Sequence, residues 1–191
     1  MSECKVVGVV ASGAGGVEHL RSGLVEPLVA LGHTVAVTPA ARWLEDIGEI
    51  GKLEAVTGLP VRSEPRLPGE ERSHPRADAY VVGPASANTV AKLALGIGDN
   101  QALSALCESV NTIPMLVFPR VNAAHARHPA CRAHLEVLRS TGVQLLYGND
   151  IWALHEPRSE GDRRPLPWAQ IVEAAQQLMV CGPARGGGER S

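Results

Sequence analysis

The stretch DAYVVGPASANT, residues 78–89, joins a β-branched run to a cluster of small and polar residues. The run at 79–83 is typical of a strand that is buried on both faces. We expect Pro84 to stop the pairing of this strand, and Ser86, Asn88 and Thr89 to offer polar groups on a turn kept narrow by alanines. Capping of the next helix would use one of these groups and leave two without a role.

Four other short apolar runs repeat this strand pattern, and segments with helical spacing lie between them. The runs are CKVVGVVA, TVAV, PMLVF and VQLL. Apolar residues recur at helical spacing from Val17 to Leu31, Val90 to Ile97, Leu135 to Leu138 and Ile171 to Leu178. This alternation predicts a doubly wound parallel α/β sheet, Rossmann-like or flavodoxin-like, with helices on both faces. Ligands of such sheets bind at the carboxyl ends of the strands.

Length and composition fit one globular domain. The chain has 191 residues, 45% of them hydrophobic, and we expect one domain at 1–180 followed by a disordered tail at 181–191. Two proline-rich or polar stretches, 60–75 and 147–167, are predicted to be surface loops, and the second has the length of a lid.

Charge and cysteine content exclude several classes. The formal charge of -2 comes from 18 basic and 20 acidic residues without long single-sign runs, which argues against nucleic acid or a membrane surface as a partner. We find no signal-peptide pattern and no membrane span, so we expect a cytoplasmic protein. The four cysteines form no CxxC pair, and neither a metal site nor a disulfide framework is predicted.

The two turns that follow the first two strands are candidate phosphate sites. In ASGAGG, residues 11–16, glycines let the backbone approach an anion, and the Ser12 hydroxyl could join the backbone amides beside Gly13. A tight turn without a ligand needs glycines too. Thr38 ends the second strand, and taken alone it reads as an ordinary helix N-cap before Pro-Ala-Ala.

The segment FPRVNAAHARHP, residues 118–129, follows the fourth strand and again combines a proline, an asparagine and histidines. Each histidine in isolation reads more simply as a surface residue than as a catalyst. The stronger argument is that four polar strand ends converge on one edge of the sheet.

PASANT at 84–89, followed by AKLALGIGDN at 91–100 and by FPRVN, resembles the homo-oligomeric flavin-containing cysteine decarboxylases. That family includes phosphopantothenoylcysteine decarboxylases and enzymes that decarboxylate the C-terminal cysteine of a peptide. The resemblance implies FMN, with its phosphate near Ser12, Gly13 and Thr38. Its ring is implied to lie against a run of six residues: Pro84, Ala85, Ser86, Ala87, Asn88 and Thr89. It also implies a homo-oligomer, a trimer or a dodecamer of trimers.

Three departures from the family pattern concern the substrate end. The family's PxMNxxMW reads Pro119, Arg120, Val121, Asn122 and then His125, so the asparagine is kept and both methionines are lost. The family's histidine lies fourteen residues before PASANT, where this chain has Glu70; His74 follows four residues later. The polar loop at 147–168 has no cysteine to match the clamp cysteine of phosphopantothenoylcysteine decarboxylases.

The resemblance implies oxidative decarboxylation of a cysteine. The flavin supplies an electron sink, because a thioaldehyde formed by hydride loss from Cβ accepts the electrons left as CO2 departs, and the product is an enethiol. His74 is the candidate base, with His125 as a competing base. Asn88 would orient the carboxylate or the flavin, and Asn122 with Arg120 would contact the substrate.

We therefore expect an FMN-dependent enzyme that acts on a cysteine-terminated peptide, in the biosynthesis of an aminovinyl-cysteine type product. Two alternatives stay open. One is a phosphopantothenoylcysteine decarboxylase of coenzyme A biosynthesis. The other is a flavin-binding partner protein without catalysis.

Overall fold

The computed structural model describes residues 4–64, 69, 73–159 and 164–181. Its centre is one five-stranded parallel sheet with the strand order β2-β1-β3-β4-β5. The strands are β1 (Val6–Ala11), β2 (Thr34–Pro39), β3 (Ala79–Ala85), β4 (Met115–Pro119) and β5 (Gln144–Leu145). The flavodoxin-like fold expected from the alternating runs is confirmed, and each of the five apolar runs forms a strand.

Strand β1 is the switch point of the sheet, because the next two strands in the sequence, β2 and β3, lie on opposite sides of it. The strand β1 pairs with β2 on one side, where Val10 faces Thr38, and with β3 on the other, where Val10 faces Val82. In a doubly wound sheet the connections on the two sides of such a strand pass over opposite faces, which opens a crevice at the carboxyl ends of β1 and β3. The turns after these two strands are therefore where a ligand is expected.

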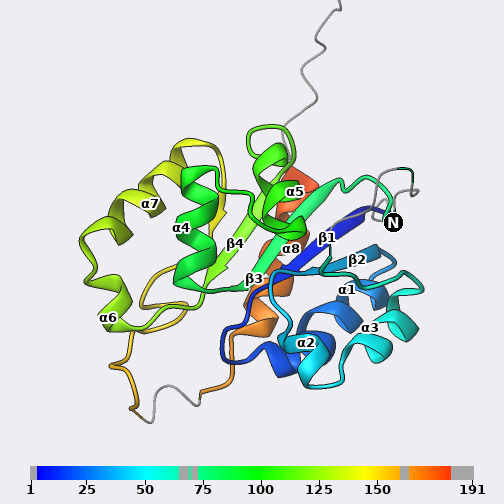
Figure 1. Cartoon of the computed structure of the whole chain (residues 1–191), viewed down its shortest axis with the longest axis horizontal. Helices are drawn as coiled ribbons and strands as arrows, with labels where there is room; N and C mark the ends of the chain where they lie inside the picture. Colours follow the sequence, from blue (N-terminus) through cyan, green and yellow to red (C-terminus); the bar gives the residue numbers. More distant parts are fainter. Residues whose placement is uncertain (1–3, 65–68, 70–72, 160–163, 182–191) are drawn as a thin grey trace, which may run out of the picture.

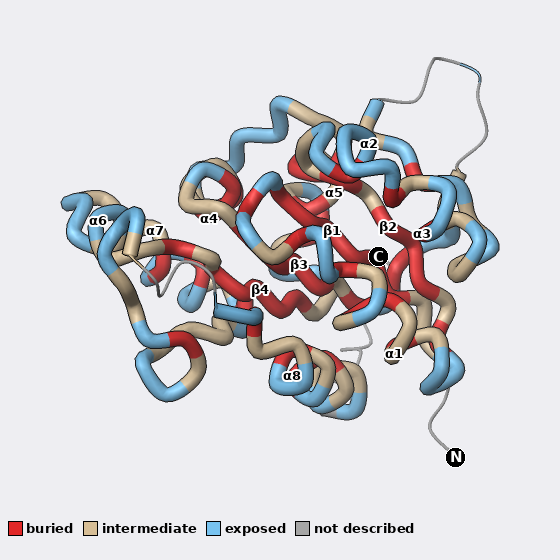
Figure 2. Tube along the Cα trace, turned by 90° about the horizontal axis from the view of Figure 1, so that it is seen from below, coloured by how far each residue is buried: buried red, intermediate tan, exposed pale blue. Residues whose placement is uncertain are grey.

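Helices cover both faces of the sheet, as expected (Figure 1). One face packs on η1 (Val17–His19), η2 (Arg21–Val25), α1 (Glu26–Ala30), α3 (Ile50–Thr57) and α8 (Trp168–Cys181). The other face packs on α4 (Ala87–Leu95), α5 (Gln101–Ser109) and α7 (Pro129–Ser140). Two short helices, α2 (Trp43–Asp46) and α6 (Ala123–Ala126), follow β2 and β4. In Figure 2 the buried strands lie between these two helical layers.

Successive side chains of a strand point to opposite faces of the sheet, so the buried residues form two hydrophobic clusters, one on each face. On β1, Val7, Val9 and Ala11 face the layer of α1 and α8, whereas Val10 faces the layer of α4 and α5. All four side chains are nearly inaccessible to solvent. A strand of this kind needs apolar residues at every position, which is why it reads as a continuous run and not as an alternating one.

Two expectations about the turns are corrected. Pro84 does not end β3: the Gly83–Pro84 bond is cis, the ladder is irregular between Val82 and Ala85, and Ala85 then pairs with Pro119. Thr38 is not a helix N-cap, because it lies within β2 and the next helix begins at Trp43.

The sequence reading missed helices α2, α3, α5 and α6. Of the helical pattern assigned to 90–97, the last residue lies beyond the end of α4, whose C-cap is Gly96. The expected tail at 181–191 begins within α8, which ends at Cys181, and residues 182–191 lie outside the described residues. Among the described helices, none has both the length and the apolar character needed to cross a membrane.

Candidate functional site

Ser12 joins the two turns at the switch point. Its hydroxyl donates a hydrogen bond to the carbonyl of Pro84 (2.7 Å) and accepts one from the amide of Ser86 (2.7 Å), while its own amide donates to the same Pro84 carbonyl (3.1 Å). Ser12 is 4% exposed. The turn after β1 and the turn after β3 are thus one hydrogen-bonded unit, although 72 residues separate them.

The glycine turn after β1 is shaped by close neighbours. A Cβ on Gly13 would lie 3.2 Å from the indole of Trp43, and Gly16 has φ +96 with Leu166 directly against its Cα. The amide of Gly16 donates to the carboxylate of Glu18 (3.0 Å). This turn therefore has a backbone N–H that already holds an anionic oxygen, which is the chemistry a phosphate requires.

The polar residues of the β3 turn divide into a cap and an exposed group. Ser86 caps α4, because its hydroxyl accepts from the amide of Thr89 (3.3 Å) and lies 3.1 Å from the Thr89 hydroxyl. Thr89 is buried, whereas Asn88 is exposed in the first turn of α4. Capping accounts for Ser86 and Thr89, and Asn88 is the side chain left for another partner.

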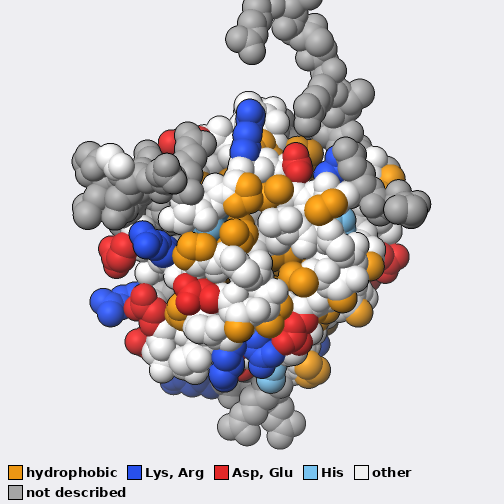
Figure 3. Space-filling model, turned by 90° about the vertical axis from the view of Figure 1, so that its right-hand side faces the viewer, with side chains coloured by type: hydrophobic (Ala, Val, Ile, Leu, Met, Phe, Trp, Pro, Cys, Tyr) orange, Lys and Arg blue, Asp and Glu red, His pale blue; other side chains and the backbone are white. Residues whose placement is uncertain are grey.

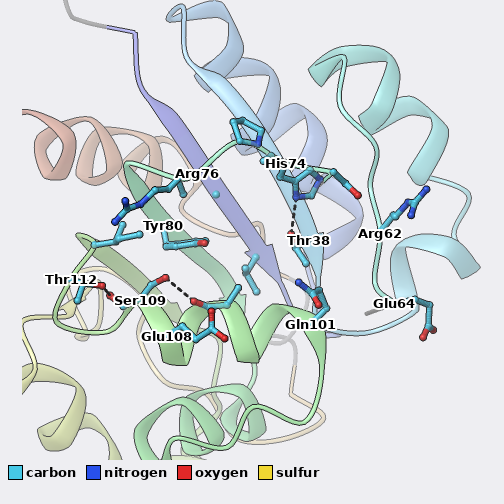
Figure 4. Close-up of a pocket in the computed structure, with 18 residues that line it drawn as sticks. Thr38, Arg62, Glu64, His74, Arg76, Tyr80, Gln101, Glu108, Ser109 and Thr112 are labelled. Atoms are coloured by element: carbon cyan, nitrogen blue, oxygen red, sulfur yellow. Dashed lines mark hydrogen bonds between the residues drawn. The ribbon is translucent and has the colours of Figure 1, made fainter. Parts of the chain in front are cut away.

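A cavity of about 700 Å³ lies on the α5 side of the sheet (Figure 4). It lies over the β1–β2 part of the sheet, between α5 and the chain at 73–77. Thr38 and His74 line the end nearest the carboxyl edge of β2, and Arg62, Glu64, Arg76 and Glu108 contribute both signs of charge. The structure thus brings together Thr38 and His74, two residues that the sequence assigned to different roles.

Small residues keep the floor of this cavity flat. Gly8 and Ala36 lie side by side in register on β1 and β2. The ring of Tyr80 on β3 lies so close over Gly8 that a Cβ there would be 2.4 Å from the ring. A larger residue than glycine at position 8 would have to displace the aromatic ring, which the sequence alone did not indicate.

Residues 96–100, GIGDN, hold helix α5 in place, and α5 forms one wall of the cavity. Asn100 is the N-cap of α5, and its side-chain oxygen accepts from the amide of Leu103 (2.9 Å). Asp99 pairs with Lys92 of α4. This part of the motif therefore positions α5, from which Gln101 and Glu108 reach the cavity.

Arg120 lies at the carboxyl end of β4, beside the glycine turn. Its amide donates to the carbonyl of Ala85 (2.7 Å), and its guanidinium lies over the ring of Trp152, 5.1 Å from the centroid. A Cβ on Gly15 would be 3.7 Å from this guanidinium. Arg164 lies over the same indole at 4.3 Å. Arg120 therefore brings positive charge both to the glycine turn and to the segment that follows β4, residues 120–126.

Asn122 and His125 belong to α6. Asn122 is its N-cap and accepts from the amide of His125 (3.0 Å), and His125 is exposed. Neither residue lines the cavity that holds His74. The two candidate bases are thus in different surroundings: His74 lies in the cavity, and His125 lies at the surface of a short helix.

The loop at 147–168 is hydrogen-bonded to α6 and to the residue that follows it. The amide of Ala123 donates to the carbonyl of His155 (2.9 Å), and Arg127 forms a two-pronged ion pair with Glu156 (2.6 and 3.0 Å). Leu166 of the same loop packs against Gly16, and Trp168, the first residue of α8, packs against Gly23. The described part of the loop therefore covers the η1 side of the glycine turn.

Three residues of the site were missed by sequence reasoning, namely Trp43, Tyr80 and Trp152, and so were the capping roles of Asn100 and Asn122. Trp43 had a usable signal, because a tryptophan soon after a strand end is unusual in a chain that is 3% aromatic. Glu70, which occupies the family's histidine position, lies outside the described residues.

Charge and thiol chemistry add two observations about the described residues. On the face shown in Figure 3, acidic and basic side chains are interspersed. No cluster of three potential metal ligands occurs in the part of the chain that the structure describes. Burial raises the pKa of the Cys107 and Cys131 thiols, which keeps them protonated and poorly nucleophilic.

A protein-family model described as Flavoprotein matches residues 5–180. The chain belongs to this family. The match covers β1 through α8, so it includes both turns that Ser12 joins and the cavity on the α5 side of the sheet.

Among curated relatives, the coenzyme A biosynthesis bifunctional protein CoaBC of Mycolicibacterium smegmatis is 29% identical over 183 residues, covering 90% of this chain and 41% of the relative. The chain thus spans less than half the length of this relative.

Two solved structures share the fold. One is the FMN-dependent cysteine decarboxylase TvaF from thioviridamide biosynthesis, at 21% identity and a TM-score of 0.62, covering 92% of this chain and 98% of that one. The other is the peptidyl-cysteine decarboxylase EpiD, at 18% identity and a TM-score of 0.67, covering 93% and 99%.

Proposed function

We propose that this protein is an FMN-dependent decarboxylase that converts the C-terminal cysteine of a peptide to an enethiol. The observation that carries the proposal is the pair of turns joined by Ser12 at the switch point, together with a cavity on the α5 side of the sheet that Thr38 and His74 line. Family membership and the likeness to TvaF, whose description names FMN, support FMN as the cofactor.

The residues at the switch point fit FMN. The amide of Gly16 donates to the Glu18 carboxylate, which a phosphate oxygen would have to displace to use this donor, and Arg120 next to Gly15 would supply a positive charge. Gly13 and the Pro84–Ala85 segment present little side-chain bulk. FMN bound there would supply the electron sink that loss of CO2 from cysteine requires.

Each polar residue has a proposed part in holding the substrate. His74 accepts the thiol proton from within the cavity, and Asn88, exposed beside the β3 turn, hydrogen-bonds the substrate carboxylate or the cofactor. Asn122 and Arg120 contact the substrate from the end of β4. The hydroxyl proton of Ser12 is engaged by Pro84, so Ser12 contributes by orienting the turns.

The lack of a cysteine in the loop at 147–168 favours an unsaturated product. A saturated product needs a proton donor after decarboxylation, and the thiols of Cys107 and Cys131 lie in the core layer of α4, α5 and α7. We therefore favour the peptide reaction over the coenzyme A reaction. The resemblance also supports a homo-oligomer, a trimer or a dodecamer of trimers, and the cytoplasmic location stays the expectation from the sequence.

Mass spectrometry after incubation with each substrate class tests this function. A cysteine-terminated peptide that loses CO2 and two hydrogens supports the proposal. Loss of CO2 alone from phosphopantothenoylcysteine would instead support the coenzyme A reaction, and no change in either substrate, in a protein that binds FMN, would support the non-catalytic partner.

The Asn88→Asp variant tests the role of Asn88 in the same assay. A second negative charge beside the substrate carboxylate should lower turnover by about a hundredfold or more, while FMN binding is retained. Full turnover with normal FMN content would remove Asn88 from the reaction. Asn111→Asp, at an exposed turn remote from the carboxyl edge, is the matched control.

A further inference from the structure

His74 is held by a backbone carbonyl. Its Nε2 lies 2.6 Å from the carbonyl oxygen of Pro60, fourteen residues earlier in the chain. A carbonyl oxygen can only accept a hydrogen bond, so the proton of the neutral imidazole belongs on Nε2. The short distance favours this tautomer over the alternative, which would set two lone pairs against each other.

The other ring nitrogen is then an acceptor. Nδ1 lies 3.5 Å from the hydroxyl oxygen of Thr38, on the neighbouring strand β2 (Figure 4). This distance is long for an O–H···N hydrogen bond, but catalytic contacts are often long before substrate binds. Both side chains line the cavity of about 700 Å³, so Nδ1 and the Thr38 hydroxyl face the same space.

We propose that the Pro60 carbonyl and the Thr38 hydroxyl fix His74 as a base that acts through Nδ1, with Thr38 as the group that passes the proton to it. The proposal rests on the proposed function, because it assumes that a substrate thiol enters this cavity. It gives Thr38 a role different from the phosphate contact that the family resemblance implies.

The two roles of Thr38 exclude each other. A hydroxyl has one proton, and a phosphate oxygen and an imidazole lone pair both need that proton as acceptors. If Thr38 donates to Nδ1, it cannot donate to FMN in the same state. The affinity for FMN relative to riboflavin, which lacks the phosphate, therefore separates the two roles.

The proton transfer balances without a further reactant. The S–H bond of the substrate breaks and its proton goes to the Thr38 oxygen, while the former Thr38 proton goes to Nδ1. The products are a thiolate and an imidazolium. The imidazolium keeps its Nε2–H bond to Pro60, and the carbonyl dipole stabilises the new positive charge.

Nitrogen-15 NMR of the histidine rings tests both hydrogen bonds without any activity measurement. His74→Gln identifies the His74 signals by their loss. We expect the wild-type protein, at a pH where His74 is neutral, to show a protonated Nε2 and an unprotonated Nδ1. A protonated Nδ1 would overturn the proposal.

Substitutions of Thr38 provide the second test. In Thr38→Val the Nδ1 signal should move toward that of an imidazole without a donor, and Thr38→Ser should restore it. Thr34→Val is the matched control, since Thr34 is on the same face of the same strand and half-buried as well. An Nδ1 signal unchanged in Thr38→Val would contradict the Thr38 contact.

Kinetics and flavin affinity complete the test. We expect Thr38→Val to slow flavin reduction by a cysteine-terminated peptide by about tenfold or more, with FMN and riboflavin affinities both within about twofold of wild type. A selective loss of FMN affinity would instead make Thr38 a phosphate contact. If wild type converts no cysteine substrate, the proposed function and the relay fail together, while the NMR signals still decide the hydrogen bonds.

Discussion

Ser12 is the residue through which the two turns of the site hold each other. Three hydrogen bonds connect it to Pro84 and Ser86, and almost none of its surface is accessible to solvent. Removing the hydroxyl would leave the Pro84 carbonyl with one donor fewer and the Ser86 amide without its acceptor. Buried polar groups that lose a partner are costly.

We therefore expect Ser12→Ala to lower the free energy of unfolding by about 1–3 kcal/mol, as measured by urea denaturation. FMN binding should weaken as well, because the turns lose their mutual orientation. Ser140→Ala, which removes an exposed hydroxyl bond at the end of α7, should stay within about 0.5 kcal/mol of wild type. Equal losses in the two variants would contradict the role given to Ser12.

Gly16 and Gly32 share a left-handed backbone conformation but differ in their neighbours. Both have positive φ, +96 and +87, but Leu166 contacts Gly16 whereas nothing lies within 4 Å of a Cβ at Gly32. Gly32→Ala should lose about 1–2 kcal/mol of stability from backbone strain alone. Gly16→Ala should lose more, because Leu166 must also move, and urea denaturation of both variants gives the difference.

At the scale of elements, the loop at 147–168 is held to α6 by Arg127 and Glu156. The hydrogen bond from Arg127 lowers the pKa of the Glu156 carboxyl below its usual value of 4.5. A carboxyl whose pKa is lowered in the folded state stabilises that state above its unfolded pKa and loses this effect as the pH falls through the folded value. The loop contact is therefore complete at neutral pH and weakens below about pH 4.5.

Glu156→Gln should release the loop without unfolding the protein. Because the pair is exposed, global stability should barely change, but trypsin should cleave faster after Arg158, an exposed residue of the same loop. Gel electrophoresis during limited proteolysis gives the rate. Glu136→Gln, which removes another exposed pair on α7, should leave cleavage at Arg158 unchanged.

Elements with a strong local signal were predictable, and those without one were not. The run from Val6 to Ala11 is apolar at every position and could only be a buried strand. By contrast, α3 buries only Leu53, so its pattern is weak. Helix α5 buries Ala102, Leu103 and Leu106, a helical pattern that was overlooked. Pro84 was misjudged because a strand can pass through a proline when the ladder is irregular there.

At the scale of the whole molecule, His33 connects the beginnings of β1 and β2. Its Nδ1 accepts from the amide of Lys5 (3.3 Å), and burial lowers its pKa from the usual 6.5. The folded state therefore resists protonation more than the unfolded chain does. Stability is complete above pH 6.5 and falls as the pH drops toward the lowered value.

We expect urea midpoints of the wild-type protein to decrease between pH 7 and pH 5, and His33→Phe to reduce this slope. His19→Gln, at an exposed histidine on η1, should keep the wild-type slope. A slope unaffected by His33→Phe would assign the pH dependence to another group.

Sequence alone was sufficient for the fold, because the fold follows from the order of strands and helices; the carboxyl edge as the place of the site stays a prediction. It could not bring His74 to Thr38, since that contact depends on the path of an irregular segment between β2 and β3. Nor could it reveal the Ser12 bridge, because hydroxyl partners 72 residues apart leave no local pattern.

The Ser12 bridge has a consequence for the order in which the protein matures. The bridge requires β3 beside β1, and the chain must have been made as far as Ser86 before the bridge can form. Parallel pairing of this kind closes a long loop and forms late in folding. Newly made chains therefore gain the Ser12 bridge only once β3 has paired with β1, and we expect flavin uptake to follow that pairing.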